Sequence, residues 1–205
     1  MLERLDRSEI VLIVAVAFFT LTGAVGIAFF DDPEPTRLVE PPIQPFPGAR
    51  VTPLDAVAWF GAVRQHCNPV EVETHLDWQP APTTPEGDMY KAACYALAGR
   101  IDRAREAIES LPPKRRYEAA GVVFEAGHPA ADAGDDIAAG PLMELVVEYW
   151  PNHYMALYHA GAARFETGDY EVAEGYLRRF LEEYRMDDGW TGSARSMLQT
   201  IDDRG

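Results

Sequence analysis

The sequence has little cysteine and far fewer basic than acidic residues. Among its 205 residues are two cysteines, 18 lysines and arginines, and 33 aspartates and glutamates, which give a formal net charge of −15. An acidic surface repels phosphate groups, so this balance argues against nucleic acid as a partner and favours a protein partner with a basic patch. With 47% apolar residues, the chain can still form a sizeable core.

Short motifs of the common enzyme classes are also absent. The sequence contains no Gly-x-Ser-x-Gly nucleophile elbow, no phosphate-binding P-loop and no Rossmann fingerprint. The pair Glu182-Glu183 is typical of a solvated helix face. His153 and His159 are six residues apart, on different faces of a helix, and are expected to be exposed or core side chains. The sequence therefore predicts no enzyme activity, no cofactor and no small-molecule substrate.

The two cysteines, Cys67 and Cys94, leave a disulfide and free core thiols as open alternatives. A bridge would close a loop of about 28 residues and contribute roughly 3 kcal/mol, whereas a free thiol would fill a small apolar position in a helix. Combined with His66 and His75, the cysteines show no ligand spacing such as Cys-x-x-Cys, so no metal site is expected. No motif for covalent haem attachment occurs either.

One hydrophobic run, residues 10–30, carries no charge over 21 residues. As a helix of about 31 Å, it is long enough to cross a hydrocarbon core of about 30 Å. Arg4 and Arg7 precede it and the next basic residue is Arg37, so the positive-inside rule places residues 1–9 in the cytoplasm. We therefore expect a single-pass protein of a bacterial-type inner membrane, with the rest of the chain in the periplasm.

The same run contains small residues that raise two further questions. A cleaved signal peptide, with Gly26 and Ala28 near the cut site, is an alternative, although three acidic residues before the run argue against it. Small residues that would let another membrane helix approach closely are Thr20, Thr22, Ala24, Gly26 and Ala28. Chance is an alternative for this stripe, because such residues are common in membrane helices.

Residues 31–53 contain seven of the 16 prolines. This composition is typical of an extended, polyproline-like linker, whose reach is at most roughly 70 Å at about 3.1 Å per residue. Such a linker would hold a domain of residues 54–205 away from the bilayer, unless its apolar residues lie along a groove of that domain or of a partner.

Helix start signals repeat through this domain, and no stretch has the alternation of a strand. Thr52-Pro53, Asn68-Pro69 and Thr84-Pro85 each place a capping side chain before a proline at the first helical position. The sequence predicts an all-α domain. Its helices are expected near residues 53–66, 69–78, 85–98, 101–111, 114–126, 141–149, 152–167, 170–184 and 190–202.

A repeat also runs through the domain. Three times a small residue is followed by Gly seven positions later and by Ala five positions after that, with starts 35 and 34 residues apart: Ala92, Gly99 and Ala104; Gly127, Gly134 and Ala139; Gly161, Gly168 and Ala173. A period in this range is typical of stacked helical hairpins and not of a closed catalytic domain.

The copy at residues 154–187 resembles the tetratricopeptide repeat family, whose unit is a helix-turn-helix with small residues at the helix crossing. The turn Gly168-Asp169-Tyr170 and the early alanine of the second helix, Ala173, carry this resemblance. Residues 85–118 resemble the family less closely, because Leu111-Pro112-Pro113 ends the second helix early.

The copy between these two departs most from the family pattern. Pro129 and Pro141 are expected to interrupt its helices, so coincidence is an alternative explanation of its triad. The resemblance implies a right-handed solenoid of stacked hairpins. In it, residues 53–78 would form a hairpin without the triad and residues 189–202 a terminal capping helix.

The resemblance further implies a concave groove lined by the first helix of each repeat. By that analogy the residues that face the groove are Met89, Ala93, Met155, Tyr158, Ala162 and Phe165. Methionine and aromatic side chains suit the capture of a peptide or helix. Each of the six fits an ordinary core position as well.

Together these features predict a membrane-anchored interaction scaffold without enzyme activity. It would be an accessory or assembly subunit of a larger membrane complex of the translocon, respiratory or photosynthetic type. One alternative is a periplasmic chaperone-like module that the anchor merely tethers. Another is a redox or metal protein that uses Cys67 and Cys94.

Overall fold

The computed structural model of the chain describes residues 55–204. The predicted cytoplasmic segment, the membrane helix with its stripe of small residues, and the proline-rich linker lie outside these residues and stay predictions. Within residues 55–204, none of the helices combines the length and the apolar character that a membrane crossing requires.

Nine α-helices and one short 3₁₀ helix form residues 55–204, and no strand occurs among these residues. In chain order they are α2 (Ala56–Val63), η1 (Arg64–His66), α3 (Val72–Trp78), α4 (Pro85–Leu97), α5 (Ile101–Glu109), α6 (Pro113–Asp132), α7 (Asp136–Tyr149), α8 (Tyr154–Glu166), α9 (Tyr170–Glu183) and α10 (Gly189–Asp202). The predicted all-α class is therefore confirmed for the described part of the chain.

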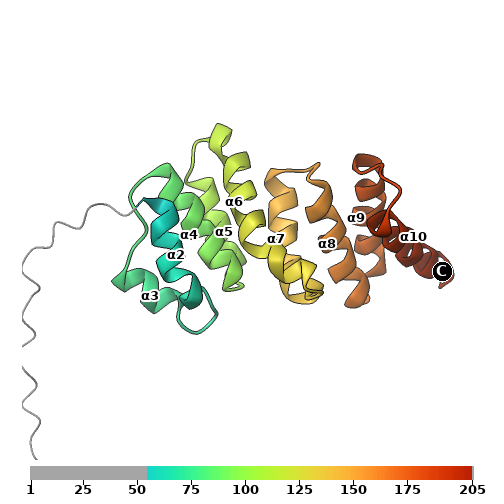
Figure 1. Ribbon diagram of the computed structural model, residues 1–205, viewed down its shortest axis with the longest axis horizontal. Coiled ribbons are helices and arrows are strands. Elements are labelled where there is room, and N and C mark those ends of the chain that lie inside the picture. Colours follow the sequence, from blue (N-terminus) through green and yellow to red (C-terminus); the bar gives the residue numbers. More distant parts are fainter. Residues whose placement is uncertain (1–54, 205) are drawn as a thin grey trace, which may run out of the picture. The chain divides into compact units, whose positions relative to one another are not determined.

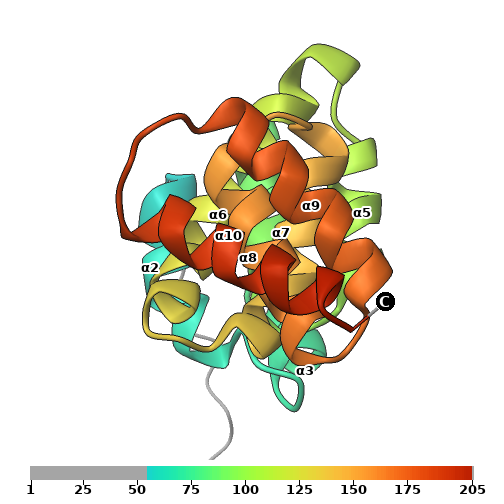
Figure 2. The same ribbon diagram turned by 90° about the vertical axis from the view of Figure 1, so that its right-hand side faces the viewer.

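From α4 to α10 these helices lie side by side in chain order along one axis, with α2 and α3 at the N-terminal end of the row (Figure 1). The pairs α4 and α5, α6 and α7, and α8 and α9 are helical hairpins, and each hairpin packs against the next. α2 packs against α4, and α10 packs against α8 and α9 (Figure 2). The arrangement is that of a helical solenoid, in which each repeat contacts only its neighbours.

Each hairpin turn has the same backbone structure at the second residue of its triad. Gly99, Gly134 and Gly168 have φ values of +68°, +89° and +81°, a left-handed conformation that glycine adopts at no steric cost. In all three turns the glycine N–H and the following N–H donate to carbonyls of the last helical turn, which is the Schellman motif. The middle triad is therefore a structural repeat and not a coincidence.

The first residue of the triad lies where the two helices of a hairpin touch. A Cβ atom added to Gly127 would lie 2.6 Å from Leu142 Cδ1, and one added to Gly161 would lie 2.8 Å from Leu177 Cγ. Such distances are far inside van der Waals contact, so a larger residue at either crossing would displace the leucine side chain opposite. Ala92 is completely buried at the same position of the first repeat.

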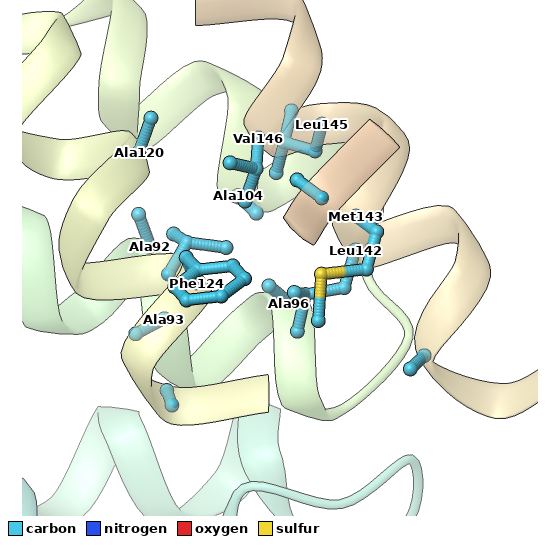
Figure 3. Close-up of a cluster of buried hydrophobic side chains, with 14 of the residues drawn as sticks. Ala92, Ala93, Ala96, Ala104, Ala120, Phe124, Leu142, Met143, Leu145 and Val146 are labelled. Carbon is cyan, nitrogen blue, oxygen red and sulfur yellow. The ribbon is translucent and has the colours of Figure 1, made fainter. Parts of the chain in front are cut away.

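Alanine is the commonest residue of the core. Figure 3 shows part of it, in which alanines from α4, α5 and α6 lie beside Phe124 and the larger side chains of α7. Short side chains let neighbouring helices approach closely, so the core is dense without many large residues. The largest side chain with almost no exposure is Trp59, whose Nε1–H donates to the Gln79 carbonyl at 3.0 Å.

The prediction that Pro129 and Pro141 interrupt helices is wrong. α6 runs through Pro129 to Asp132, and α7 begins at Asp136, five residues before Pro141. A proline inside a helix costs about 3 kcal/mol, but both helices bury long apolar faces that offset this cost. Asp135 also caps α7, because its side chain accepts a hydrogen bond from the Ala138 N–H at 3.2 Å.

Other boundaries shift for local reasons. α3 begins at Val72, three residues later than predicted, because the Asn68 side chain accepts the N–H groups of Val70 and Glu71 and holds a separate turn there. The first predicted helix divides at Val63 into α2 and η1.

Candidate functional site

An open cleft of about 310 Å³ lies between α2, α4 and α6, which we call the α2–α4–α6 groove. It is lined by Phe60, Arg64, Tyr90, Glu118, Gly121, Val122, Glu125 and Ala126. Its apolar part includes the rings of Phe60 and Tyr90, whose centroids are 5.1 Å apart, and the half-buried Val122. Charged side chains surround this apolar part, so the groove has the polar rim and apolar centre of a peptide-binding site.

Arg64 is fixed at one edge of the α2–α4–α6 groove. Its Nη2 donates to the Ala126 carbonyl at 3.2 Å, and its guanidinium lies 5.9 Å from the centre of the Phe60 ring. A cation held over an aromatic face is attracted by the ring. Arg64 therefore closes the edge of the groove between α2 and α6, while the Glu125 carboxylate remains exposed.

A row of aromatic side chains continues from this groove toward the C-terminal end. Trp150 lies over Gly121, where an added Cβ atom would be 3.7 Å away, and packs on Tyr117 with ring centres 4.2 Å apart. Further along, Tyr154 stacks on Tyr184 at 4.9 Å. Tyr117 and Tyr154 are 49% and 43% exposed. We call Tyr117, Trp150, Tyr154 and Tyr184 the aromatic row.

The structure does not bring the six residues predicted to line a groove onto one open surface. Four of them are buried: Met89, Ala93, Tyr158 and Ala162. Met155 and Phe165 are partly exposed. Tyr158 is covered because Phe180 of α9 and Trp190 of α10 pack against its ring, with centres 5.2 and 4.9 Å away.

The exposed residues that sequence analysis missed are close neighbours of those predicted. Tyr90 follows Met89 directly, and Tyr154 precedes Met155. Successive residues are about 100° apart around a helix. An error of one position in the assigned helix face therefore selects a core side chain in place of a groove side chain. The spacing of Tyr117 and Gly121, one turn apart on α6, is the sequence signal that could have indicated this surface.

The structure joins Cys67 and Cys94 by a disulfide, with Cα atoms 4.9 Å apart. The bridge connects the residue after η1 to α4, and both sulfur-bearing residues are buried. The rings of His66 and His75 stack on each other, with centres 3.9 Å apart. Metal binding by these cysteines would require thiolates, which the disulfide removes. Burial also shields the bridge from exchange with external thiols, so its role here is that of a staple.

A second cluster contains residues that the sequence did not single out as a set. His128 and Asp132 lie one turn apart on α6, and they meet His159 of α8 and Asp136 of α7. His159 Nδ1 is 2.7 Å from Asp136 Oδ1, and His159 Nε2 is 3.7 Å from Asp132 Oδ1. The i, i+4 spacing of His128 and Asp132 is the sequence signal. We call these four residues the histidine cluster.

His153 lies next to this cluster and caps α8. Its Nδ1 accepts a hydrogen bond from the Ala156 N–H at 3.2 Å, and its ring packs on Phe124 at 4.0 Å. Burial lowers the pKa of His153 below its usual value, and the nearby His128 lowers it further. His153 is thus held in the neutral form that the cap requires.

Most basic side chains of the array are used internally. Residues 55–204 contain 14 basic and 26 acidic residues. Every arginine in this range donates to a carboxylate, a backbone carbonyl or a tyrosine hydroxyl. For example, Glu144 and Asp169 both contact Arg164 and raise the pKa of its guanidinium. The charge left to face a partner is therefore mainly negative.

Residues 155–185, which form α8 and α9, match the tetratricopeptide repeat family. This match confirms the resemblance predicted for that copy. Comparisons with curated proteins and with solved structures gave no significant match. Members of the family are generally protein-interaction modules and not enzymes. The repeat and the helical stack around it indicate an interaction scaffold.

Proposed function

We propose that this protein is a membrane-anchored scaffold that binds a basic segment of a partner protein along the α2–α4–α6 groove and the aromatic row. It acts as an accessory or assembly subunit of a larger membrane complex, and its right-handed helical array lies on the extracytoplasmic face. The observation that carries the proposal is an exposed groove with aromatic walls in an array that includes a tetratricopeptide repeat.

The charge distribution supports a basic partner. Each arginine of residues 55–204 already has a partner within the array, whereas Glu125 of the groove faces solvent. A partner segment with lysine or arginine beside an apolar residue would place its cation near Glu125 and its apolar side chain against Phe60, Tyr90 and Val122. Opposite charges across an interface chiefly raise the association rate and the specificity.

Two observations support the membrane anchor and the extracytoplasmic placement. Residues 10–30 are apolar and long enough to span a bilayer. The Cys67–Cys94 disulfide is of a kind that persists in oxidising compartments such as the periplasm and is rare in the cytosol. A periplasmic domain joined to a membrane helix can contact a complex both within and above the bilayer.

Site-specific crosslinking in cells tests the proposal. We expect a photo-crosslinking amino acid at Val122, in the groove, to yield an adduct with one partner protein that mass spectrometry identifies. The matched control is the same amino acid at Val172, which is 38% exposed on α9 away from the groove. Equal adducts at both positions, or none at Val122, would contradict binding in the groove.

Exchange of the anchor tests the membrane part of the proposal separately. Residues 10–30 are replaced by an unrelated membrane helix, and the tagged full chain is purified in mild detergent. A subunit that packs within the complex loses its partners in this variant. If the partners are retained at the native level, the protein is instead a tethered chaperone-like module.

A further inference from the structure

The histidine cluster contains a buried histidine whose second nitrogen has no hydrogen-bond partner. His159 is 1% exposed, and within the described part of the chain its Nε2 makes no hydrogen bond. The same holds for Nε2 of His128, which lies 3.1 Å from Asp132 Oδ1 but outside hydrogen-bonding geometry. A buried polar atom without a partner costs free energy, so its presence in a packed core calls for a ligand.

Asp136 determines which nitrogen of His159 is available. Its carboxylate lies 2.7 Å from His159 Nδ1 and therefore fixes the proton on that atom. The lone pair of the neutral ring is then on Nε2, which points toward Asp132 Oδ1 at 3.7 Å. Two acceptors facing each other are stabilised by a cation between them. A carboxylate behind a ligating imidazole is the usual outer shell of a zinc site.

We propose that His128, Asp132 and His159 bind a divalent transition metal, with Zn²⁺ as the ion of choice. The ligand atoms would be Nε2 of both histidines and one carboxylate oxygen, and all three lie within 4.8 Å of one another. Zinc bonds of about 2.0 to 2.2 Å place tetrahedral ligands roughly 3.3 Å apart. The observed separations of 3.1 and 3.7 Å fit, and the two histidine nitrogens lie within 4.8 Å of each other.

The surroundings suit this ion better than a hard cation. Two imidazoles and one carboxylate favour zinc, copper or nickel over Mg²⁺, which prefers oxygen ligands. Asp132 is 47% exposed, so the ion can enter from solvent and keep water as its fourth ligand. The bound ion would clamp α6 to α8, the first helices of two successive repeats, at a point where Asp136 of α7 also attaches.

Titration of the purified full chain with zinc sulfate tests this inference. The chain carries a tag without histidine, is treated with chelator and dialysed, and is kept without reductant so that Cys67 and Cys94 remain bridged. We expect one Zn²⁺ per chain by calorimetry and elemental analysis. At a hundredfold excess over the dissociation constant, the midpoint of thermal unfolding should rise by roughly 5 to 10 °C. Mg²⁺ should produce neither effect.

Variants at His128 and Asp132, whose side chains are 26% and 47% exposed, identify the ligands with less disturbance of the core than a variant at the buried His159. H128Q and D132N should each weaken zinc binding by at least about tenfold, and D136N by about tenfold to a hundredfold through the outer shell. H66Q, at a histidine outside the cluster, is the matched control and should bind zinc normally. Binding that is absent at 100 µM zinc sulfate, or that is lost in H66Q and retained in H128Q and D132N, would overturn the assignment.

Discussion

The two ends of the array are stabilised in different ways. At the C-terminal end, α8 and α9 have 13 and 14 residues and meet at the close crossing of Gly161 and Leu177. At the N-terminal end, α2 and α3 have only eight and seven residues, and no triad is present. There the Cys67–Cys94 disulfide connects the short helices to α4. A covalent bond thus holds the end that the repeat does not.

The same contrast appears in what the two ends present to solvent. The N-terminal end, with the middle of α6, contains the α2–α4–α6 groove. The last turn of α6 and α8 contribute the histidine cluster, and α10 covers α8 behind it. In a solenoid each repeat is stabilised mainly by its neighbours, so the two ends can differ in stability and in function. The following predictions test this independence.

The largest effect is expected from removal of a core side chain at the C-terminal end. Phe180 has no exposed surface and packs against Tyr158 and Tyr184. F180A should lower the free energy of unfolding of this repeat by about 3 to 5 kcal/mol. Hydrogen exchange with mass spectrometry should show lost protection in α8, α9 and α10, with α2 and α4 little changed. Equal loss at both ends would show that the array unfolds as one unit.

Loss of the disulfide should destabilise the N-terminal end of the array and leave the C-terminal end little changed. The double variant C67A/C94A removes a constraint worth about 3 kcal/mol. We expect faster hydrogen exchange in α2, α3 and the start of α4, while peptides from α8 and α9 keep their protection. The control is the native sequence unfolded with a strong reductant and refolded under reducing conditions, because it should reproduce this pattern without replacing either cysteine. A uniform effect along the chain would contradict the division between the two ends.

A pair of glycines in one hairpin separates backbone strain from helix propensity. Gly168 has a φ of +81° at the turn, whereas Gly175 is exposed on α9 with no atom near a Cβ position. G168A should destabilise the repeat by about 1 to 2 kcal/mol, because alanine is strained in the left-handed region. G175A should stabilise it by about 0.5 to 1 kcal/mol. Chemical denaturation of both variants measures the difference, and two changes of the same sign would contradict the assigned turn.

Much of this fold could be predicted from the sequence because its signals are local. The three glycines of the turns have the same place in the spaced triad and the same left-handed conformation. Caps such as Thr84 mark helix starts directly, since the Gly87 N–H donates to its hydroxyl at 3.0 Å. The prediction of helix breaks at Pro129 and Pro141 is wrong because burial of α6 and α7 outweighs the local cost of the prolines. That burial depends on the whole stack of helices.

The candidate sites were harder to predict because they depend on how helices rotate against one another. Tyr90 and Met89 have similar sequence surroundings, yet one lines the α2–α4–α6 groove and the other is buried. His128 and His159 are 31 residues apart, and they meet only because α6 and α8 both pack against α7. Sequence spacing indicates which residues share one helix face. It does not state which face meets which neighbour.

The smallest predicted effect concerns the helix caps at the two ends. Asp55 caps α2 and Thr84 caps α4, whereas α8 is capped by His153, whose ring nitrogen must be unprotonated to accept the Ala156 N–H. Because burial lowers the pKa of His153 below its ordinary 6.5, the unfolded chain binds the proton more readily. The stability contribution is therefore complete above pH 6.5 and is lost as the pH falls below it.

Replacement of this cap should make the stability of the C-terminal end as insensitive to acid as that of the N-terminal end. Asparagine is a strong cap that does not titrate, so H153N should lose less stability than the native chain between pH 7.5 and pH 5.5. Hydrogen exchange at the first turn of α8 measures this difference, and the first turn of α2 should respond equally in both proteins. If the native chain and H153N lose the same protection at α8, another group causes the sensitivity to acid. His128 also lowers the pKa of His153. Zinc bound to His128 should therefore shift the loss of this cap to a lower pH.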